Sequence, residues 1–492
     1  MKRDIILGRI APQEAEICPD WIDEFLDQLH NNQLCMHSFL ILRHQKIVAE
    51  GYWEPFDKDS FHRMYSVSKS FVSAAVGLLC GEGKLSLDSR IIDYFPDKLP
   101  RQVHPYIAAM TVRDLLTMAT PHTTTTYKPT DKDWAWTFFN TKPDHPAGTV
   151  FQYDTSGTYV LNVLVERICQ KPFLAYLQEK VLDEIGFSRQ AWCIQAPEGY
   201  SWGGSGVMAT TRDLARFALL FMAGGRHCGR QLLPREYVTA AVSRQIDCDP
   251  AFECEPWCYG YGYQVWLMAE RIFAFRGMGS QLAICFPEKD LLFVCTGDTQ
   301  GNPAGDRILY EQFKRCVYDR VGEAVVSGTS AADRLDARLH TLKPPAVHGS
   351  TESDILSAIQ AKTYVLRDNP MGITRLRLEI EGQEGTLFYS TPRGDKQLRF
   401  GMGHYRVDLF PETHYFGTVI GQACGRQYRA MSSAAWTQPN KLVIRCYIID
   451  DYFGNLTITL AYKGDEIGIS MHKNAEWFLD EYEGFAGGHC GD

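Results

Sequence analysis

The sequence predicts an α+β protein, in which an antiparallel sheet flanked by helices is followed by an all-β barrel or sandwich domain. Strand-like segments lie at both ends of the first 330 residues, and helical patterns lie between them. A polar stretch that contains prolines follows. The rest of the chain consists of short segments in which apolar and polar residues alternate. We therefore expect a first domain at 1–330, a linker at 331–353 and an all-β accessory domain at 354–492.

Each expected element of the first domain has its own pattern. "HSFLILRHQKIVAEGYW" is typical of a hairpin, with strands near 39–42 and 47–52 around a polar turn. Apolar residues at helical spacing follow from residue 71. Three more strands are expected near the end of the domain, at 259–267, 271–286 and 289–297. The segment 304–325 is amphipathic and closes the domain as a helix.

The C-terminal region has strand patterns only. "ITRLRLEI", "GTLFYST", "KLVIRCYI" and "NLTITLAY" alternate between apolar and polar residues and are separated by Gly, Asn and Asp. Short strands at regular spacing are typical of a small barrel or sandwich.

Composition excludes several classes of function. A net charge of -9 argues against a nucleic-acid or anionic-membrane partner, since both require a basic surface. Charged residues interrupt the N-terminal segment, so it lacks the apolar region of a secretory signal. No run of 18 apolar residues occurs, so no membrane span is expected either. Fifteen scattered cysteines, an odd number, are typical of reduced thiols in the cytoplasm.

One local cysteine cluster could hold a metal. Cys248, Cys254 and Cys258 would need a fourth ligand to bind zinc, and their spacing matches no standard zinc site. We expect a loop with free thiols and no metal. The sequence also lacks a His-Glu-x-x-His motif, a phosphate-binding loop and a dinucleotide fingerprint, so no cofactor is expected.

The stretch "SVSK" places a nucleophile beside a base. Ser66 falls at the first turn of the predicted helix, and Lys69 lies three residues further on the same face. A helix N-terminus also directs free N–H groups at a developing oxyanion. A second Ser-x-x-Lys, Ser470 to Lys473, ends a strand-like segment and lacks this context.

Several ordered blocks resemble a known superfamily. They include "SVSKSF", "MTVRDLLTMAT", "FQYDTSGTYVLNVLVERI", "GGSGVMATTRDLARFALLFMAGG" and "GMGSQLAICFPEKDLLFVC". Together they resemble the serine β-lactamase and penicillin-binding-protein superfamily over about residues 30–325. The resemblance is to its class C-like branch in particular, which includes esterases, D-aminopeptidases and 6-aminohexanoate-dimer hydrolases.

The resemblance implies catalytic roles. Ser66 matches the nucleophile that forms an acyl-enzyme, Lys69 the amine that takes its proton, and Tyr153 the tyrosine of the Tyr-x-Asn motif, which shuttles protons. Thr155 stands at the asparagine position, where it keeps a hydroxyl but loses the amide. The backbone N–H groups of Ser66 and Gln281 are the expected oxyanion donors.

The resemblance also points to residues that contact the substrate. Met278 stands where the superfamily's third motif, Lys-Thr-Gly or His-x-Gly, normally presents a cation, and Gly279 leaves room for close approach of the substrate. Arg276 lies two residues earlier on the same strand face and could substitute for that cation, and Trp202 adjoins a matched block.

These residues predict a serine hydrolase that cleaves an amide or ester bond of a small molecule. Two alternatives stay open: an acyltransferase that uses the same acyl-enzyme, and a binding or sensor protein that stays acylated. The identity of the substrate, the oligomeric state and the role of the second domain are open at this stage.

Overall fold

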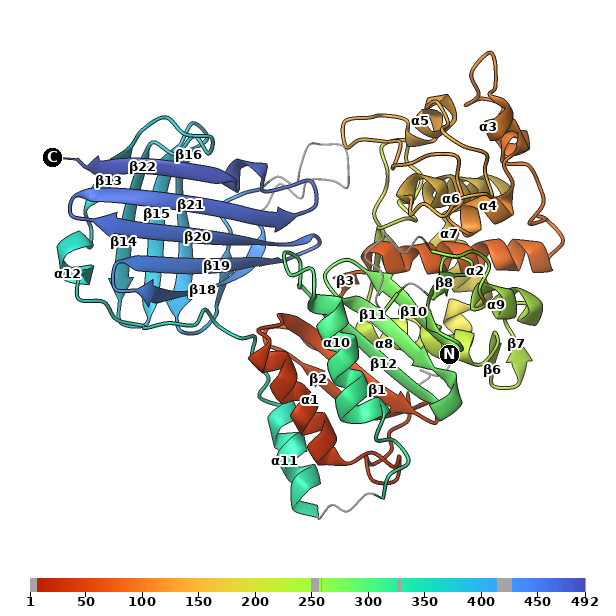
Figure 1. Ribbon diagram of the computed structural model, residues 1–492, viewed down its shortest axis with the longest axis horizontal. Coiled ribbons are helices and arrows are strands. Elements are labelled where there is room, and N and C mark those ends of the chain that lie inside the picture. Colours follow the sequence, from red (N-terminus) through yellow and green to blue (C-terminus); the bar gives the residue numbers. More distant parts are fainter. Residues whose placement is uncertain (1–6, 249–255, 258, 325–328, 414–426, 492) are drawn as a thin grey trace.

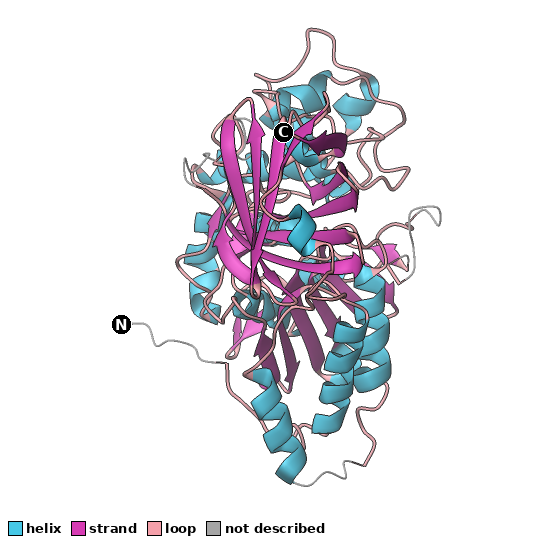
Figure 2. Cartoon of the chain, turned by 90° about the vertical axis from the view of Figure 1, so that its left-hand side faces the viewer, coloured by secondary structure: helices cyan, strands magenta, loops and turns pink. Residues whose placement is uncertain are grey.

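The computed structural model describes residues 7–248, 256–257, 259–324, 329–413 and 427–491. Two bodies of different architecture meet side by side in Figure 1: a mixed helix and sheet region, and a β-barrel at the C-terminal end. Figure 2 shows the same chain from its side, with helices gathered on the first body and almost none on the barrel.

A seven-stranded antiparallel sheet forms the frame of the first body. In spatial order its strands are β2 (Lys46–Tyr52), β1 (Met36–Arg43), β12 (Leu291–Gly297), β11 (Gln281–Phe286), β10 (Ile272–Gly277), β9 (Trp266–Ala269) and β8 (Gly260–Tyr261). Strands β1, β11 and β12 are buried along their whole length, because helices cover both faces. The predicted antiparallel sheet flanked by helices is confirmed.

Two strand predictions were wrong in detail. The segment 271–286 is a hairpin of β10 and β11, because Gly279 and Ser280 take positive φ angles of 76° and 70° and reverse the chain within three residues. The segment 259–267 divides into β8 and β9, and the side chain of Gln264 between them, itself at a positive φ of 58°, turns inward to bond backbone carbonyls.

Helices cover the sheet on both faces (Figure 1). One face carries α1 (Pro19–Asn31), α10 (Gly305–Phe313), a π-helical turn η5 (Lys314–Tyr318) and α11 (Thr329–Leu339). The predicted helix 304–325 therefore ends at Tyr318. Helix α11 overlaps the start of the predicted linker 331–353 and is held to α1 by ion pairs from Arg338 to Asp23 and Asp27.

The opposite face carries α8 (Thr211–Met222), which packs on β1, β11 and β12, and a helical region around α2. Helix α2 (Ser68–Gly81) is buried from Ser68 to Leu79 and packs against α6 (Thr155–Cys169). Its neighbours are η1 (Tyr65–Val67), η2 (Ile91–Tyr94), α3 (Pro105–Ala109), α4 (Val112–Leu116), α5 (Trp134–Asn140), α7 (Phe173–Lys180), η3 (Leu182–Ile185) and α9 (Arg235–Ala241). Short strands complete it: β3 (His62–Arg63), β4 (Trp192–Cys193), β5 (Val207–Ala209), β6 (Arg226–His227) and β7 (Arg230–Gln231).

The C-terminal body is a closed barrel of nine strands, and the barrel alternative is therefore confirmed. Around the barrel the order is β16 (Gly394–Met402), β15 (Glu384–Thr391), β14 (Arg375–Glu381), β13 (Thr363–Leu366), β22 (Gly484–Cys490), β21 (Glu466–Ala475), β20 (Phe453–Lys463), β19 (Lys441–Ile449) and β18 (Arg429–Gln438). A parallel contact between β16 and β18 closes the ring, and β17 (Arg406–Leu409) adds to its edge. The short helices α12 (Leu356–Ile359) and η6 (Asp480–Tyr482) flank it.

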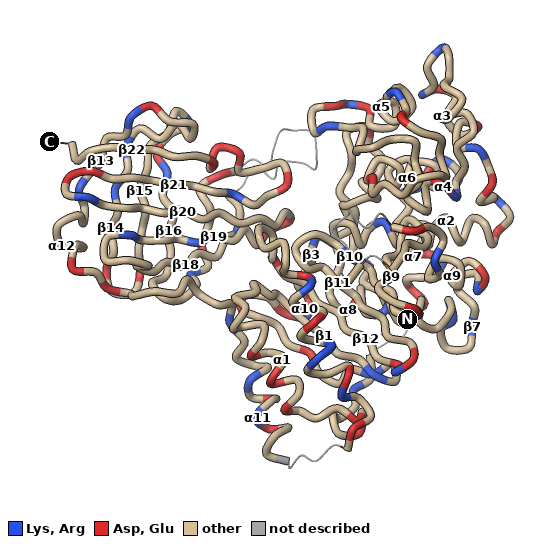
Figure 3. Tube along the Cα trace, in the orientation of Figure 1, with Lys and Arg blue, Asp and Glu red and all other residues tan. Residues whose placement is uncertain are grey.

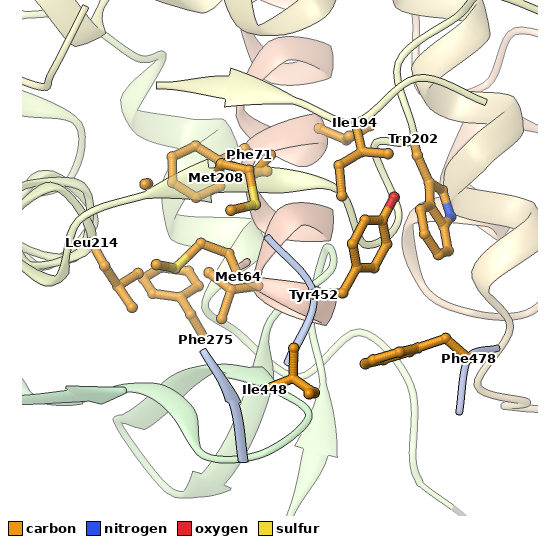
Figure 4. Close-up of a cluster of buried hydrophobic side chains, with 14 of the residues drawn as sticks. Met64, Phe71, Ile194, Trp202, Met208, Leu214, Phe275, Ile448, Tyr452 and Phe478 are labelled. Carbon is orange, nitrogen blue, oxygen red and sulfur yellow. The ribbon is translucent and has the colours of Figure 1, made fainter. Parts of the chain in front are cut away.

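The barrel packs directly on the first body. In Figure 4, Ile448, Tyr452 and Phe478 of the barrel lie in one apolar cluster with Met64 and Trp202. Figure 3 shows acidic and basic residues interspersed over both bodies. Among the described residues, no helix has the length and apolar character needed to cross a membrane.

Candidate active site

Ser66 lies at the entrance of the buried helix α2. The preceding residue, Tyr65, has a positive φ of 45°, which is uncommon for an aromatic residue and marks a sharp backbone turn. The turn η1 leads directly into α2, so Ser66 is partly exposed while the helix behind it is buried. The positive end of the α2 dipole therefore faces the Ser66 side chain.

Lys69 reaches Ser66 from the first turn of α2. Its Nζ lies 3.1 Å from Ser66 Oγ and donates to the backbone carbonyl of Gly204 at 2.7 Å. Burial lowers the pKa of Lys69 to about 7, while Glu476 and Asp154 act in the opposite direction. A substantial fraction of this amine is therefore neutral near pH 7 and can accept a proton.

Tyr153 completes a cluster with Ser66 and Lys69. It hydrogen-bonds the Ser66 side chain, and its ring centre lies 5.1 Å from Lys69 Nζ. Asp154 follows it and caps α6 by accepting the N–H groups of Ser156 and Gly157, which fixes the position of Tyr153. Burial raises the pKa of Tyr153 to about 12, against the opposing effect of the Ser66 hydrogen bond, so the phenol is protonated at neutral pH.

The β10–β11 hairpin lies against the backbone that precedes Ser66. A Cβ added at Gly277 would lie 2.3 Å from the carbonyl oxygen of Met64, so only glycine allows this approach. The Gln281 side chain is fully buried and donates to three carbonyls, those of Met278, Gly279 and Gly297, which holds the turn in place. The role of the Gln281 backbone N–H as an oxyanion donor stays a prediction.

Three of the predicted substrate-contacting residues meet at a cavity of about 790 Å³. Arg276, Met278 and Gly279 line it. The Arg276 side chain is 30% exposed and donates from Nε to Asp306 Oδ2 at 2.7 Å. The cation that could replace the missing third-motif lysine is thus present, but a carboxylate already neutralises it.

The other two predicted residues lie elsewhere. Trp202 is 1% exposed, donates from Nε1 to the Tyr127 hydroxyl at 3.0 Å, and is stacked against Trp477 of the barrel at 5.2 Å. Thr155 directs its methyl group at Gly204, beside the carbonyl that binds Lys69. Trp477, and not Trp202, is the tryptophan that lines the cavity.

Sequence reasoning missed a set of residues that connects the barrel to this site. Arg63, 1% exposed, pairs with Glu476 of the barrel at 2.6 Å and donates to the Ser205 carbonyl at 3.1 Å. Its guanidinium lies over the rings of Tyr65 and Trp202. The residues of this ion pair are more than 400 positions apart in the chain, and no local pattern marks either of them.

Two of the three cysteines that could hold a metal lie outside the residues that the structure describes. Cys248 is buried, whereas Cys254 and Cys258 lie outside the described residues. Elsewhere in the described part of the chain, no group of three His, Cys, Asp or Glu side chains is arranged to hold a metal ion.

An antiparallel sheet covered by helices, with a serine and a lysine one turn apart at the start of a buried helix, is the arrangement of the serine β-lactamase and penicillin-binding-protein superfamily. A family model described as Beta-lactamase matches residues 36–312, more than half of the chain, and the chain belongs to this family.

Two curated relatives match part of this chain. The 6-aminohexanoate-dimer hydrolase of Paenarthrobacter ureafaciens is 27% identical over 244 residues, which are 45% of this chain and 61% of the relative. A probable fimbrial assembly protein FimD of Dichelobacter nodosus is 28% identical over 190 residues, 36% of this chain and 48% of the relative. This chain therefore spans about half to three fifths of the length of these curated relatives.

Two solved structures share the fold. A putative 6-aminohexanoate-dimer hydrolase from Bacillus anthracis has a TM-score of 0.50 and 20% identity, over 63% of this chain and 82% of its own. A putative β-lactamase from Bacteroides dorei has a TM-score of 0.51 and 17% identity, over 60% of this chain and 97% of its own. At these identities the likeness concerns the fold alone.

Proposed function

We propose that this protein is a serine hydrolase that cleaves an amide or ester bond of a small molecule through an acyl-enzyme at Ser66. The observation that carries the proposal is the cluster of three side chains. Lys69 Nζ lies 3.1 Å from Ser66 Oγ, and Tyr153 forms a hydrogen bond with the side chain of the same serine. The match to the Beta-lactamase family model and a relative named as a 6-aminohexanoate-dimer hydrolase support this use of the cluster.

In the acylation step, neutral Lys69 takes the proton of Ser66 as Oγ attacks the substrate carbonyl carbon. The carbonyl π electrons move to oxygen, and the backbone N–H groups of Ser66 and Gln281 stabilise the resulting oxyanion. The tetrahedral intermediate then collapses, and the leaving alcohol or amine departs with a proton supplied from Lys69 through the Tyr153 phenol.

Deacylation runs through the same groups in reverse. The Tyr153 phenol relays one proton from water to neutral Lys69 as the water oxygen attacks the acyl carbon, and that proton returns to Ser66 Oγ as the acid product leaves. An alcohol or amine in place of water would give acyl transfer. The proposal includes a cytoplasmic location, which the odd number of 15 cysteines supports.

Intact mass spectrometry with an activated p-nitrophenyl ester tests the proposal. The full-length chain should gain the mass of one acyl group and lose it again with time, whereas Ser66→Ala should gain none. Ser470→Ala, in the second Ser-x-x-Lys on β21, is the matched control and should behave like the wild type. Equal acylation of Ser66→Ala would overturn the assignment, and an acyl group that never leaves would favour a sensor. Added alcohol that shifts the product from acid to ester would favour an acyltransferase.

A further inference from the structure

The cavity beside the proposed active site has one wall from each body of the molecule. The first body supplies Met278 and Gly279 of the β10–β11 turn, together with Arg276. The barrel supplies the segment between β21 and η6, which contributes Glu476 and Trp477. Substrate that enters a cavity of about 790 Å³ therefore touches both bodies.

Ser66, Lys69 and Tyr153 are not among the residues that line the cavity, and each wall approaches this cluster through one intervening residue. The Arg276 guanidinium lies 5.8 Å from the ring of Trp266, on which Tyr153 stacks at 5.3 Å. On the other wall, Glu476 pairs at 2.6 Å with Arg63, which stands three residues before Ser66. The cavity is thus connected to Tyr153 through Trp266 on one wall and to the backbone before Ser66 through Arg63 on the other.

The barrel segment 475–479 is held by hydrogen bonds in an unusual backbone conformation. Trp477 and Leu479 both have positive φ angles, 63° and 62°, which bulky side chains rarely adopt. Lys473 holds the loop by donating to the carbonyls of Ala475 and Phe478 and by pairing with Asp480 at 2.5 Å. Backbone strain that the surroundings over-determine is concentrated at binding sites, and here it directs Trp477 to the cavity.

One face of Trp477 is already occupied. It stacks on Trp202 with ring centres 5.2 Å apart and an interplanar angle of 5°, and Trp134 and Tyr127 surround the pair. This aromatic support fixes the ring orientation, and Trp477 is half-buried, so the remainder of the residue borders the cavity.

The charges around the cavity are balanced in pairs. Arg276 pairs with Asp306, and Lys473 pairs with Asp480. The buried guanidinium of Arg63 balances the negative charge of Glu476. The remaining polar lining consists of uncharged groups, those of Thr299, Gln300, Asn302 and Asn474. Such a surface suits an uncharged substrate arm with a flat apolar part.

We propose that the barrel segment 475–479 is the specificity wall of the active site, and that Trp477 selects substrates whose acyl or leaving group carries an uncharged, flat apolar arm. This inference rests on the proposed hydrolase function. It assigns the barrel a direct role in substrate choice, with Trp477 as a specificity-determining residue and Lys473 as a positioning residue.

The test compares Trp477→Ala with Phe485→Ala in the full-length chain. Phe485 is 77% exposed on β22 of the same barrel and serves as the control. Two ester series are used: p-nitrophenyl esters from acetyl to naphthoyl, and acetate esters from ethyl to naphthylmethyl. In at least one series Trp477→Ala should lower kcat/KM for the naphthyl member about tenfold or more, and change the smallest member less than twofold. Phe485→Ala should leave both series unchanged.

Two further variants keep the test decisive if Trp477→Ala folds poorly. Trp477→Phe should recover most of the preference, and Ala475→Leu, which adds bulk at the cavity wall, should lower kcat/KM for the large esters only. Equal effects on small and large esters, or none, would overturn the proposal. Labelling by a small fluorophosphonate separates the specificity proposal from the proposed hydrolase function. If Ser66 is labelled in every variant and the substrate preference is unchanged, the specificity proposal is wrong and the hydrolase proposal is still supported.

Discussion

At the scale of the residue, burial changes the acid–base chemistry of Lys69. The residue is 1% exposed, and burial lowers the pKa of its amine from 10.5 to about 7. The sequence predicted the pairing with Ser66 from their three-residue spacing, since such residues share a helix face. The depth of burial depends on α6 and the Gly204 carbonyl, which arrive from distant positions and could not be predicted locally.

The first prediction concerns the pH dependence of acylation. Only neutral Lys69 can accept the Ser66 proton, so kcat/KM should fall about tenfold per pH unit below a pKa near 7 and level off above it. Tyr153, with a pKa of about 12, should stay protonated throughout. Rates with an uncharged ester between pH 5 and 9 measure this. A flat profile from pH 5 upward would contradict Lys69 as the base.

The second prediction concerns substrates with a free carboxylate. Met278 carries no charge, and Asp306 neutralises Arg276 at 2.7 Å, so a carboxylate arm should be disfavoured against a matched neutral arm. Asp306→Asn should free the guanidinium and raise kcat/KM for the carboxylate substrate about tenfold, with the neutral one unchanged. Glu311→Gln, an exposed substitution on the same helix α10, is the control. A strong carboxylate preference in the wild type would show that Arg276 is already available.

At the scale of elements, strands and helices were easier to predict than turns. The hairpin of β1 and β2 and the helix behind Ser66 follow from apolar periodicity, which local sequence carries. The segment 271–286 was predicted as one strand, although Gly279 and Ser280 interrupt its apolar pattern and form the turn between β10 and β11. The left-handed Ser280 is a conformation that sequence does not signal for serine.

The third prediction tests the packing of this hairpin on the backbone that precedes Ser66, the proposed nucleophile. Gly277→Val would place a Cβ 2.3 Å from the Met64 carbonyl oxygen, so the backbone two residues before Ser66 must shift. Displacement of a reacting group by about 1 Å can cost about 100-fold in rate, and we expect that loss in fluorophosphonate labelling of Ser66. Gly468→Val, on β21, has its nearest atom at 3.9 Å and is the control. Circular dichroism should show both variants folded, and normal labelling of Gly277→Val would refute the close packing.

At the scale of the whole molecule, the barrel contributes to the site through contacts that sequence could not reveal. The Tyr65 hydroxyl, one residue before Ser66, donates to the Phe453 carbonyl of β20 at 2.9 Å, across 388 positions. Strand alternation predicted a barrel or sandwich. Which barrel loop faces the first body depends on the shape complementarity of the two folded bodies, which local sequence does not carry. The division at 1–330, 331–353 and 354–492 stays a prediction, and α11 packs on α1 within the middle segment.

A pair of buried histidines lies at this interface. His37 Nδ1 and His62 Nε2 lie 3.1 Å apart, and His62 stacks on Phe453 of the barrel at 5.2 Å. Burial lowers the pKa of His62 from 6.5 to about 4, and burial lowers the pKa of His37 as well. Both rings are therefore neutral in the folded protein, whereas in the unfolded chain they would bind protons near pH 6.5.

The last prediction follows from the sign of these shifts. Because the unfolded state binds more protons between pH 6.5 and 4, the free energy of unfolding falls as pH decreases through that range. For His62 the loss at pH 4.5 is about 2 kcal/mol relative to pH 7. His62→Gln, which cannot titrate, should lose about 2 kcal/mol less than the wild type between pH 7 and 4.5 in urea unfolding. His340→Gln, on a largely exposed ring, should lose as much as the wild type. Equal losses in wild type and His62→Gln would show that the pair does not set the acid sensitivity of the interface, and that carboxylates elsewhere do.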